Sequence, residues 1–201
     1  MRERLRGAVL AAAVTLATPA LAEPVETATA VFAGGCFWCV EADFDKVPGV
    51  LSTVSGYTGG RTENPTYEKV TFGDTGHYEA VEIVYNPEVV TFETLVNHFF
   101  RTVDPTDAGG QFCDRGDSYR TAVFVATEEE RAAAEAAKAE AGEILGEEIV
   151  TPILDAATFW KAEDYHQNYY QENPVRYRYY RWSCGRDQRI EALWGEAGKA
   201  S

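Results

Sequence analysis

The chain has 201 residues and a formal net charge of −14. A strongly acidic chain does not bind nucleic acid or anionic lipid through its bulk charge, so we expect neither class of partner. This length is typical of one domain and is enough to bury a core without cross-links.

The first residues have the layout of a secretory signal peptide. Three arginines within the first six residues precede an apolar run over 8–16. Small residues at Ala20 and Ala22 predict cleavage between Ala22 and Glu23, which would remove residues 1–22. The apolar run is too short to cross a bilayer as a stable helix, and no later run is longer. We therefore expect a periplasmic or secreted monomer, residues 23–201, without a membrane span. A retained N-terminal anchor is the alternative.

The first half of this domain predicts three strands and two helices. Glycines, prolines and asparagine separate segments whose apolar residues alternate from segments in which they recur at helical spacing. The predicted elements are a strand over 29–33, a helix over 36–46, a strand over 50–57, a loop over 58–76, a strand over 78–85 and a helix over 91–99.

The second half continues the alternation of strands and helices. Thr127, with Glu130 three residues later, forms a capping box for a helix that runs to about Leu145. The other predicted segments are a polar loop over 104–118, strands over 119–125 and 149–154, an aromatic segment over 159–180 and a last helix around 190–194. This order predicts an α+β fold: a two-layer, ferredoxin-like α/β sandwich with a mixed, mainly antiparallel sheet. We expect helices packed on the sheet, a core over 30–175 and an irregular C-terminal segment, 176–201.

Cys36 follows two glycines at the predicted start of a helix. The free backbone N–H groups and the dipole of a helix N-terminus favour a thiolate, so we expect Cys36 to be nucleophilic. Phe37 and Trp38 place two aromatic faces beside the sulfur, and these suit a small apolar group such as a thioether methyl.

Other interpretations of the cysteines remain open from the residues alone. Cys36 and Cys39 form a Cys-x-x-Cys pair at a helix start, which also fits a thioredoxin-like disulfide exchanger. An exported chain with four cysteines is also compatible with a disulfide-stabilised binding module that has no enzymatic activity. A zinc site would need a second ligand pair, whereas the three histidines, His77, His98 and His166, are scattered singly. We expect His77 and His166 to be structural, and the segment from Tyr177 to Trp182 to be packed rather than to bind nucleic acid.

Several motifs in order resemble the A-type peptide methionine sulfoxide reductases. The resemblance begins at Gly35-Cys36-Phe37-Trp38, which is followed by Glu41, and covers roughly residues 30 to 175. The other matching motifs are Gly56-Tyr57-Thr58-Gly59-Gly60, Asn64-Pro65-Thr66-Tyr67-Glu68-Lys69-Val70, Thr75-Gly76-His77-Tyr78-Glu79-Ala80-Val81, Asp104-Pro105-Thr106, Asp114-Arg115-Gly116, Tyr119-Arg120 and Ala162-Glu163-Asp164-Tyr165-His166-Gln167.

The resemblance implies an activity and a role for each matching residue. The family reduces the S epimer of methionine sulfoxide, free or in oxidised proteins, with a cysteine and with no bound cofactor or metal. The implied roles are nucleophile for Cys36, substrate-methyl binding for Phe37 and Trp38, acid for Glu79, hydrogen bonding to the sulfoxide oxygen for Tyr67 and Tyr119, and second active-site carboxylate for Asp114.

The position of Glu79 supports its role on independent grounds. A sulfoxide is a poor electrophile until its oxygen is protonated or strongly hydrogen-bonded. In the predicted strand over 78–85, Glu79 shares a face with Val81, Ile83 and Tyr85. A carboxyl on an apolar face is desolvated, which favours the protonated form. The alternative is a solvated glutamate at a strand end.

The attack would leave a sulfenic acid on Cys36, which a second thiol converts to a disulfide. Cys184 is our first choice for this resolving thiol, because the family often places it in a flexible C-terminal stretch. Cys113, where the family pattern has asparagine, is the second choice, and Cys39 is the third. An external dithiol of the thioredoxin type would then reduce the disulfide.

Overall fold

The computed structural model describes residues 26–195. The predicted signal peptide and its cleavage site therefore lie outside the described residues. Within 26–195, no helix is both long and apolar enough to span a bilayer.

The strands and helices follow one another closely along the chain. The strands are β1 (Ala28–Gly34), β2 (Val50–Thr58), β3 (Tyr78–Tyr85), β4 (Gly110–Gln111), β5 (Asp114–Arg115), β6 (Thr121–Val125), β7 (Ile153–Asp155) and β8 (Trp160–Lys161). The helices are α1 (Phe37–Phe44), α2 (Tyr67–Phe72), α3 (Phe92–Arg101), α4 (Glu128–Leu145), α5 (Tyr169–Glu172), α6 (Pro174–Ser183) and α7 (Arg186–Trp194), with short 3-10 turns η1 (Asp117–Tyr119) and η2 (Asp164–His166).

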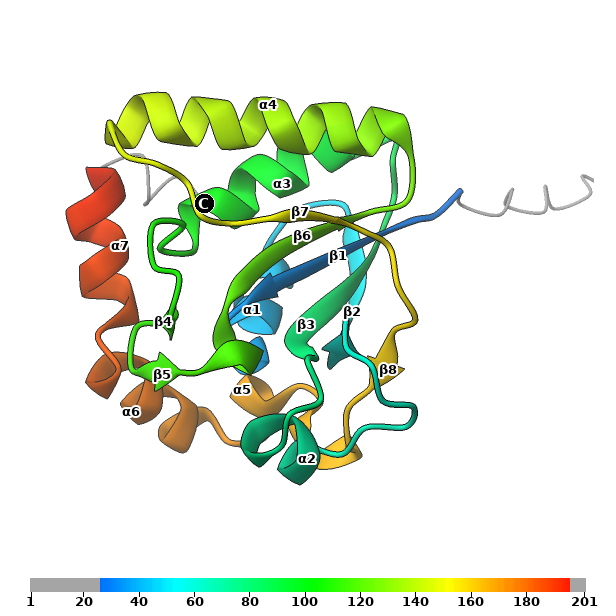
Figure 1. Ribbon diagram of the computed structural model, residues 1–201, viewed down its shortest axis with the longest axis vertical. Helices are drawn as coiled ribbons and strands as arrows, with labels where there is room; N and C mark the ends of the chain where they lie inside the picture. Colours follow the sequence, from blue (N-terminus) through cyan, green and yellow to red (C-terminus); the bar gives the residue numbers. More distant parts are fainter. Residues whose placement is uncertain (1–25, 196–201) are drawn as a thin grey trace, which may run out of the picture.

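The main sheet has the strand order β7-β6-β1-β3-β2-β8. All neighbouring strands are antiparallel except β6 and β7, which are parallel and are joined by the long helix α4 (Figure 1). The four central strands, with α1 and α3 as their connections, have the ferredoxin-like arrangement. The predicted fold, a mixed and mainly antiparallel sheet with helices packed on it, is confirmed.

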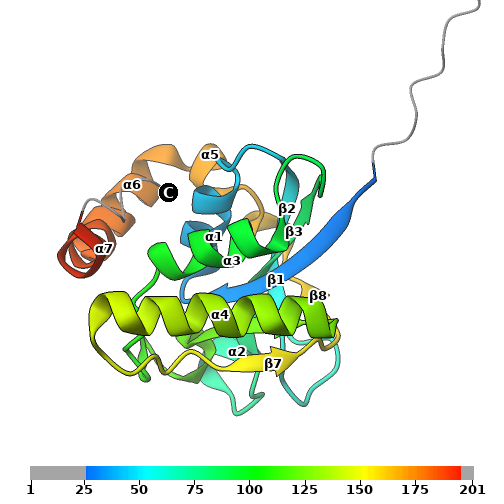
Figure 2. The same cartoon turned by 90° about the horizontal axis from the view of Figure 1, so that it is seen from above.

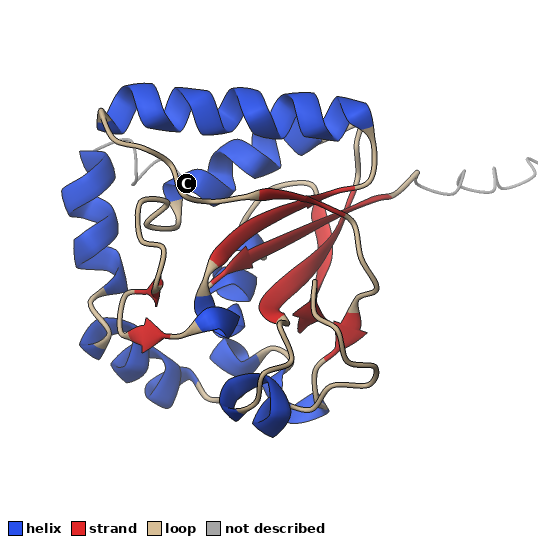
Figure 3. Cartoon of the chain, in the orientation of Figure 1, coloured by secondary structure: helices blue, strands red, loops and turns tan. Residues whose placement is uncertain are grey.

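The core lies between the sheet and the helices α1 and α3. Phe32 on β1 stacks on Phe44 of α1 and Phe99 of α3, with ring centroids 5.4 and 5.1 Å away. The buried residues of α4 are three alanines, which let this helix pack closely. Figure 2 shows α3 and α4 running side by side, and Figure 3 shows helices bordering the sheet on several sides.

The structure differs from the sequence prediction in the loops and at the C-terminus. The predicted loop over 58–76 contains α2, the one over 104–118 contains the β4–β5 hairpin, and the predicted strand over 149–154 is reduced to β7. Within the segment expected to be irregular, α6 was not predicted, whereas the predicted last helix around 190–194 is α7. No apolar period marks α6, because its inward side includes Tyr177 and Arg181 rather than aliphatic residues.

Candidate active site

The candidate site forms where β1 ends and α1 begins. Gly35 has a φ of +80°, and a Cβ atom there would lie 2.5 Å from the Cβ of Gln111, so glycine is required for both reasons. Cys36 is the N-cap residue of α1, and its carbonyl accepts a hydrogen bond from the Cys39 N–H at 3.0 Å. The tight turn thereby places the Cys36 thiol against the sheet.

Glu79 reaches the same point from the start of β3. Its carboxylate oxygen Oε2 accepts a hydrogen bond from the backbone N–H of Phe37 at 3.1 Å, and the residue is buried. Burial is the largest influence on this carboxyl and raises its pKa to about 8. Glu79 is therefore protonated at neutral pH and can act as an acid. This agrees with the sequence prediction, which placed Glu79 on the apolar face of β3.

Tyr67 on α2 and Tyr119 on η1 complete a polar cluster around Glu79. Tyr119 is hydrogen-bonded to the Glu79 carboxyl, and the two phenols are hydrogen-bonded to each other. Burial raises the pKa of both phenols, so both remain neutral hydrogen-bond donors. Three elements that are far apart in the sequence thus bring together side chains that the motifs had named.

The expectation that the helix N-terminus lowers the pKa of Cys36 is wrong for the substrate-free protein. Burial is the largest influence and raises the pKa of the Cys36 thiol, and the neighbouring Cys39, Glu79 and Asp114 add to this effect. The pKa of Cys39 is lowered, chiefly by its hydrogen bond with Cys36. Desolvation of the thiolate exceeds the helix effect here, because Cys36 is almost fully covered.

A cluster of aromatic rings holds Trp38 in place beside the cysteine. The Trp38 indole stacks on Tyr169 at a centroid distance of 3.7 Å and donates its N–H to Nδ1 of His166 at 3.1 Å. Phe37 is buried in the core, whereas Trp38 is partly exposed. The exposed part of the ring makes Trp38 the more accessible of the two aromatics for a substrate.

The two histidines that we expected to be structural make such contacts. His77 accepts a hydrogen bond from the N–H of Gly60 at 3.1 Å, and its other ring nitrogen lies 2.8 Å from the Thr62 carbonyl oxygen. His166 is buried and orients Trp38. Neither is placed as a base for Cys36.

Two further residues support the site and were missed from the sequence. The Tyr180 hydroxyl on α6 donates to the Asp114 carboxylate on β5, and burial raises the pKa of Asp114. Glu163 accepts hydrogen bonds from the Tyr67 backbone N–H and the Tyr57 hydroxyl, both at 2.9 Å. Nothing distinguishes Tyr180 among the eleven tyrosines of the chain, whereas Glu163 lies in a matching motif that carried no implied role.

Cys113 and Cys184 form a disulfide with their Cα atoms 4.9 Å apart, and Cys36 and Cys39 are free thiols. The first and second choices for the resolving thiol are therefore bonded to each other. The expected flexible stretch around Cys184 is instead the junction of α6 and α7.

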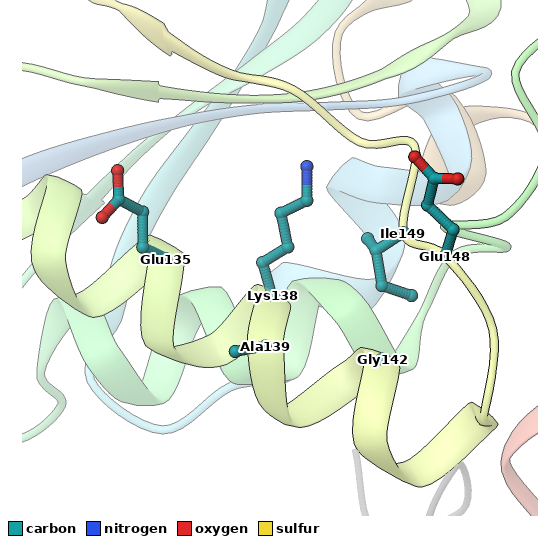
Figure 4. Close-up of a pocket in the computed structure, with 6 residues that line it drawn as sticks. All are labelled: Glu135, Lys138, Ala139, Gly142, Glu148 and Ile149. Carbon is teal, nitrogen blue, oxygen red and sulfur yellow. The ribbon is translucent and has the colours of Figure 1, made fainter.

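Other groupings of polar residues do not compete with this site. Within residues 26–195, the only cluster with metal-ligand geometry is Cys113, Asp114 and Cys184, whose two sulfurs are already joined. A hollow beside α4 is shown in Figure 4, where Lys138 lies between Glu135 and Ile149. The Lys138 ammonium donates to the Thr151 carbonyl at 2.7 Å, and no cysteine lines this hollow.

Comparison with known proteins identifies the family. The family described as "Peptide methionine sulfoxide reductase" matches residues 28–198. The chain is 52% identical over 179 residues to "Peptide methionine sulfoxide reductase MsrA 2" of Rhizobium meliloti, covering 89% of each chain.

Solved structures agree with this match. Methionine sulfoxide reductase A of Corynebacterium diphtheriae is similar with a TM-score of 0.68 and 36% identity over 77% of this chain and 78% of that one. Mxr1 from Saccharomyces cerevisiae in complex with Trx2 is similar with a TM-score of 0.52 and 25% identity over 73% of this chain and 87% of that one. The chain therefore belongs to the peptide methionine sulfoxide reductase family.

Proposed function

We propose that the protein reduces the S epimer of methionine sulfoxide, free or in oxidised proteins, with Cys36 as the nucleophile. The observation that carries this proposal is the meeting of Cys36 with a protonated carboxyl and two neutral phenols at the end of β1. A disulfide exchanger or a binding module has no use for such donors, whereas a sulfoxide oxygen needs them. The preference for the S epimer rests on the family.

The chemical step transfers one oxygen atom. Glu79, Tyr67 and Tyr119 bind the sulfoxide oxygen, and Glu79 gives it a proton while the Cys36 sulfur attacks the methionine sulfur. The hydroxyl then passes from the methionine sulfur to the Cys36 sulfur: the S–O bond on methionine breaks, an S–O bond on Cys36 forms, and the transient S–S bond breaks with its electron pair returning to methionine. Cys36 ends as a sulfenic acid. The proton of the Cys36 thiol replaces the one that Glu79 lost, so methionine is reduced and the protons balance.

Cys39 is the resolving thiol in this proposal, in place of Cys184. It lies one helical turn from Cys36, is hydrogen-bonded to it and is the other free thiol of the chain. Its lowered pKa favours the thiolate that attacks the sulfenic acid. Condensation releases one water molecule and forms a Cys36–Cys39 disulfide.

A thioredoxin-like dithiol then restores the two thiols. This part of the proposal is supported by the related Mxr1, which has been solved in complex with Trx2. We further propose that the protein acts as an exported monomer, on the strength of the signal-peptide pattern over 1–22. The mass of the protein recovered from its native compartment tests cleavage before Glu23.

The reaction is tested with separate S and R epimers of a methionine sulfoxide substrate and dithiothreitol as reductant. We expect reduction of the S epimer only, and no reduction by the folded Cys36→Ser variant. Equal reduction of both epimers, or activity that survives the loss of Cys36, would refute the proposal. Peptide mapping after one turnover without reductant should show the Cys36–Cys39 disulfide.

A further inference from the structure

One short segment of the chain holds the Trp38 indole on two sides. The indole N–H donates to Nδ1 of His166 at 3.1 Å, and one face of the ring stacks on Tyr169 with the centroids 3.7 Å apart and the planes within 8° of parallel. Two rings stacked this closely leave no space for another group between them. A substrate methyl group that packs on Trp38 therefore meets the rest of the indole, which is partly exposed, while Tyr169 supports the opposite face.

Gln167 fixes this segment to the sheet. Its side-chain oxygen accepts a hydrogen bond from the Ser55 backbone N–H, and its side-chain nitrogen donates to the Ser55 carbonyl oxygen, both at 3.0 Å. The same nitrogen donates to the Ala162 carbonyl oxygen, also at 3.0 Å. The side chain thus continues the hydrogen bonding of β2 beyond the residues that pair with β8, and Gln167 has little freedom to move.

Glu41 on α1 fixes the next residue of the segment. Its Oε2 accepts a hydrogen bond from the Asn168 backbone N–H at 3.1 Å, and the Glu41 side chain is fully buried. Asn168 has a φ of +52°, in the left-handed region that asparagine adopts more readily than most residues. The hydrogen bond stabilises this conformation, which sets the direction in which the chain continues to Tyr169.

One face of α1 carries these contacts. Trp38, Glu41 and Asp45 are spaced three and four residues apart, so they lie along the same side of the helix. Asp45 accepts a hydrogen bond from the Tyr170 hydroxyl at 2.7 Å. The three consecutive residues 168–170 are thus each held by α1, and Figure 2 shows α5, which begins within them, beside that helix.

The contact between Glu41 and Asn168 does not depend on a negative charge. Burial is the largest influence on the Glu41 carboxyl and raises its pKa to about 7, while the hydrogen bond from Asn168 acts in the opposite direction. A protonated carboxyl still offers an oxygen atom as an acceptor, and so does a glutamine amide. An acceptor oxygen at this position is therefore sufficient to hold Asn168.

We propose that Glu41 and Tyr169 are positioning residues that keep the Trp38 indole in one orientation. Glu41 acts through Asn168, and Tyr169 acts by stacking on the ring. The inference rests on the function proposed above, with Trp38 as a wall for the substrate methyl group, the role that the family implies for it. A wall that is held from behind cannot retreat to admit a larger group, so the site discriminates between a methyl and a longer alkyl group on the sulfoxide sulfur.

Two S-epimer substrates that differ by one methylene test the pocket: methionine sulfoxide and ethionine sulfoxide, with dithiothreitol as reductant. We expect the wild type to prefer the methyl substrate by at least about tenfold in kcat/KM. Glu41→Ala and Tyr169→Leu should lower this preference by about threefold or more, because the indole can then move back. Glu41→Gln and Tyr169→Phe keep the acceptor oxygen and the ring, and should keep the wild-type preference. A wild type without the preference, or a preference unchanged in Glu41→Ala and Tyr169→Leu, would overturn the inference.

The orientation of Trp38 can be measured without turnover. Fluorine NMR of protein labelled with a fluorotryptophan reports on the four tryptophans of the chain, and Trp38→Phe identifies the signal of Trp38. This signal should be single and narrow in the wild type and in Glu41→Gln, and broadened or split in Glu41→Ala. Should Glu41→Ala fail to fold, Tyr169→Leu gives the same comparison. A signal that stays single and narrow in the variant would overturn the inference, whereas the expected spectra from a protein that reduces no sulfoxide would refute only the proposed function.

The matched control is Tyr179→Leu. Tyr179 is 68% exposed on α6, and its ring lies 6.1 Å from that of Trp182, so the change removes a tyrosine beside a tryptophan that the site does not use. The predicted packing of the segment from Tyr177 to Trp182 holds for Tyr177 and fails for these two exposed side chains. The control should alter neither the substrate preference nor the Trp38 signal, and a change as large as that in Tyr169→Leu would contradict the assigned role.

Discussion

Burial keeps both Glu79 and Cys36 protonated in the substrate-free site. Both pKa values are raised, so at neutral pH the substrate-free site holds a carboxylic acid next to a thiol instead of a carboxylate next to a thiolate. Glu79 can therefore donate a proton, whereas the neutral Cys36 thiol is a weaker nucleophile than a thiolate. Proton transfer from Glu79 to the substrate oxygen relieves this arrangement, because the charge on the carboxylate can then be neutralised by the proton of Cys36.

The pH dependence of the rate should report the ionisation of Glu79. We expect kcat/KM to fall as the pH rises through about 8, since the acid is then lost. In Glu79→Gln this alkaline limb should disappear, and the rate at pH 7 should drop by about 10²- to 10⁴-fold. A variant that keeps both the rate and the limb would show that another group supplies the proton.

The same carboxyl should also affect stability. The folded-state pKa of Glu79 is about 8, above the ordinary value of 4.5, so the unfolded chain loses this proton first as the pH rises. Below pH 4.5 the neutral carboxyl makes its full contribution to the free energy of unfolding. As the pH rises from 4.5 to about 8, this contribution decreases by no more than about 1.4 kcal/mol per pH unit. Urea denaturation across this range should give a less negative slope for Glu79→Gln than for the wild type. Parallel slopes would contradict the shift.

At the scale of elements, the sequence predicted those whose signals are local. Thr127 was predicted as a helix cap, and it accepts a hydrogen bond from the backbone N–H of Glu130 at 3.1 Å. The alternation along β3 predicted the buried face that carries Glu79. The motifs likewise named the residues that meet at Cys36.

The features that were missed depend on contacts across the chain. Helix α6 has no apolar period, because its inward contacts include an ion pair between Arg181 and Asp43 of α1 at 2.8 Å. The bond between Cys113 and Cys184 spans 71 residues, and no local pattern could pair them. Tyr180 gains its role only because α6 packs beside β5.

The ion pair that holds α6 to α1 should contribute strongly to stability. Asp43 and Arg181 are both largely buried, and Asp43 also lies 3.8 Å from the buried Arg186. Asp43→Ala therefore removes the buried carboxylate that faces both guanidinium groups and leaves Arg181 only its exposed partner Asp187, at a cost of about 3 to 5 kcal/mol. The control is Asp155→Ala, which removes the exposed partner of Arg131 and should cost less than about 1 kcal/mol. Both values come from urea denaturation, and equal losses would show that α6 does not depend on this pair.

For the whole molecule, the disulfide ties the C-terminal helices to the β4–β5 hairpin. Closing a loop of 71 residues reduces the entropy of the unfolded chain, which corresponds to about 4 kcal/mol. We expect dithiothreitol to lower the urea midpoint of the wild type and to leave that of Cys113→Ser/Cys184→Ser unchanged. A wild-type midpoint that does not respond to reductant would show that this bond constrains the unfolded chain very little.

The main sheet is bounded by β7 and β8, which have three and two residues. Long exposed border strands offer unpaired N–H and C=O groups that recruit strands from other chains into aggregates. Oxidation of a buried methionine makes its side chain polar and disrupts the core around it, which exposes segments of this kind. We propose that this protein binds such chains as substrates. Its edge strands β7 and β8 are too short to pair with the exposed strands of these chains, so it can act on them without joining their aggregates.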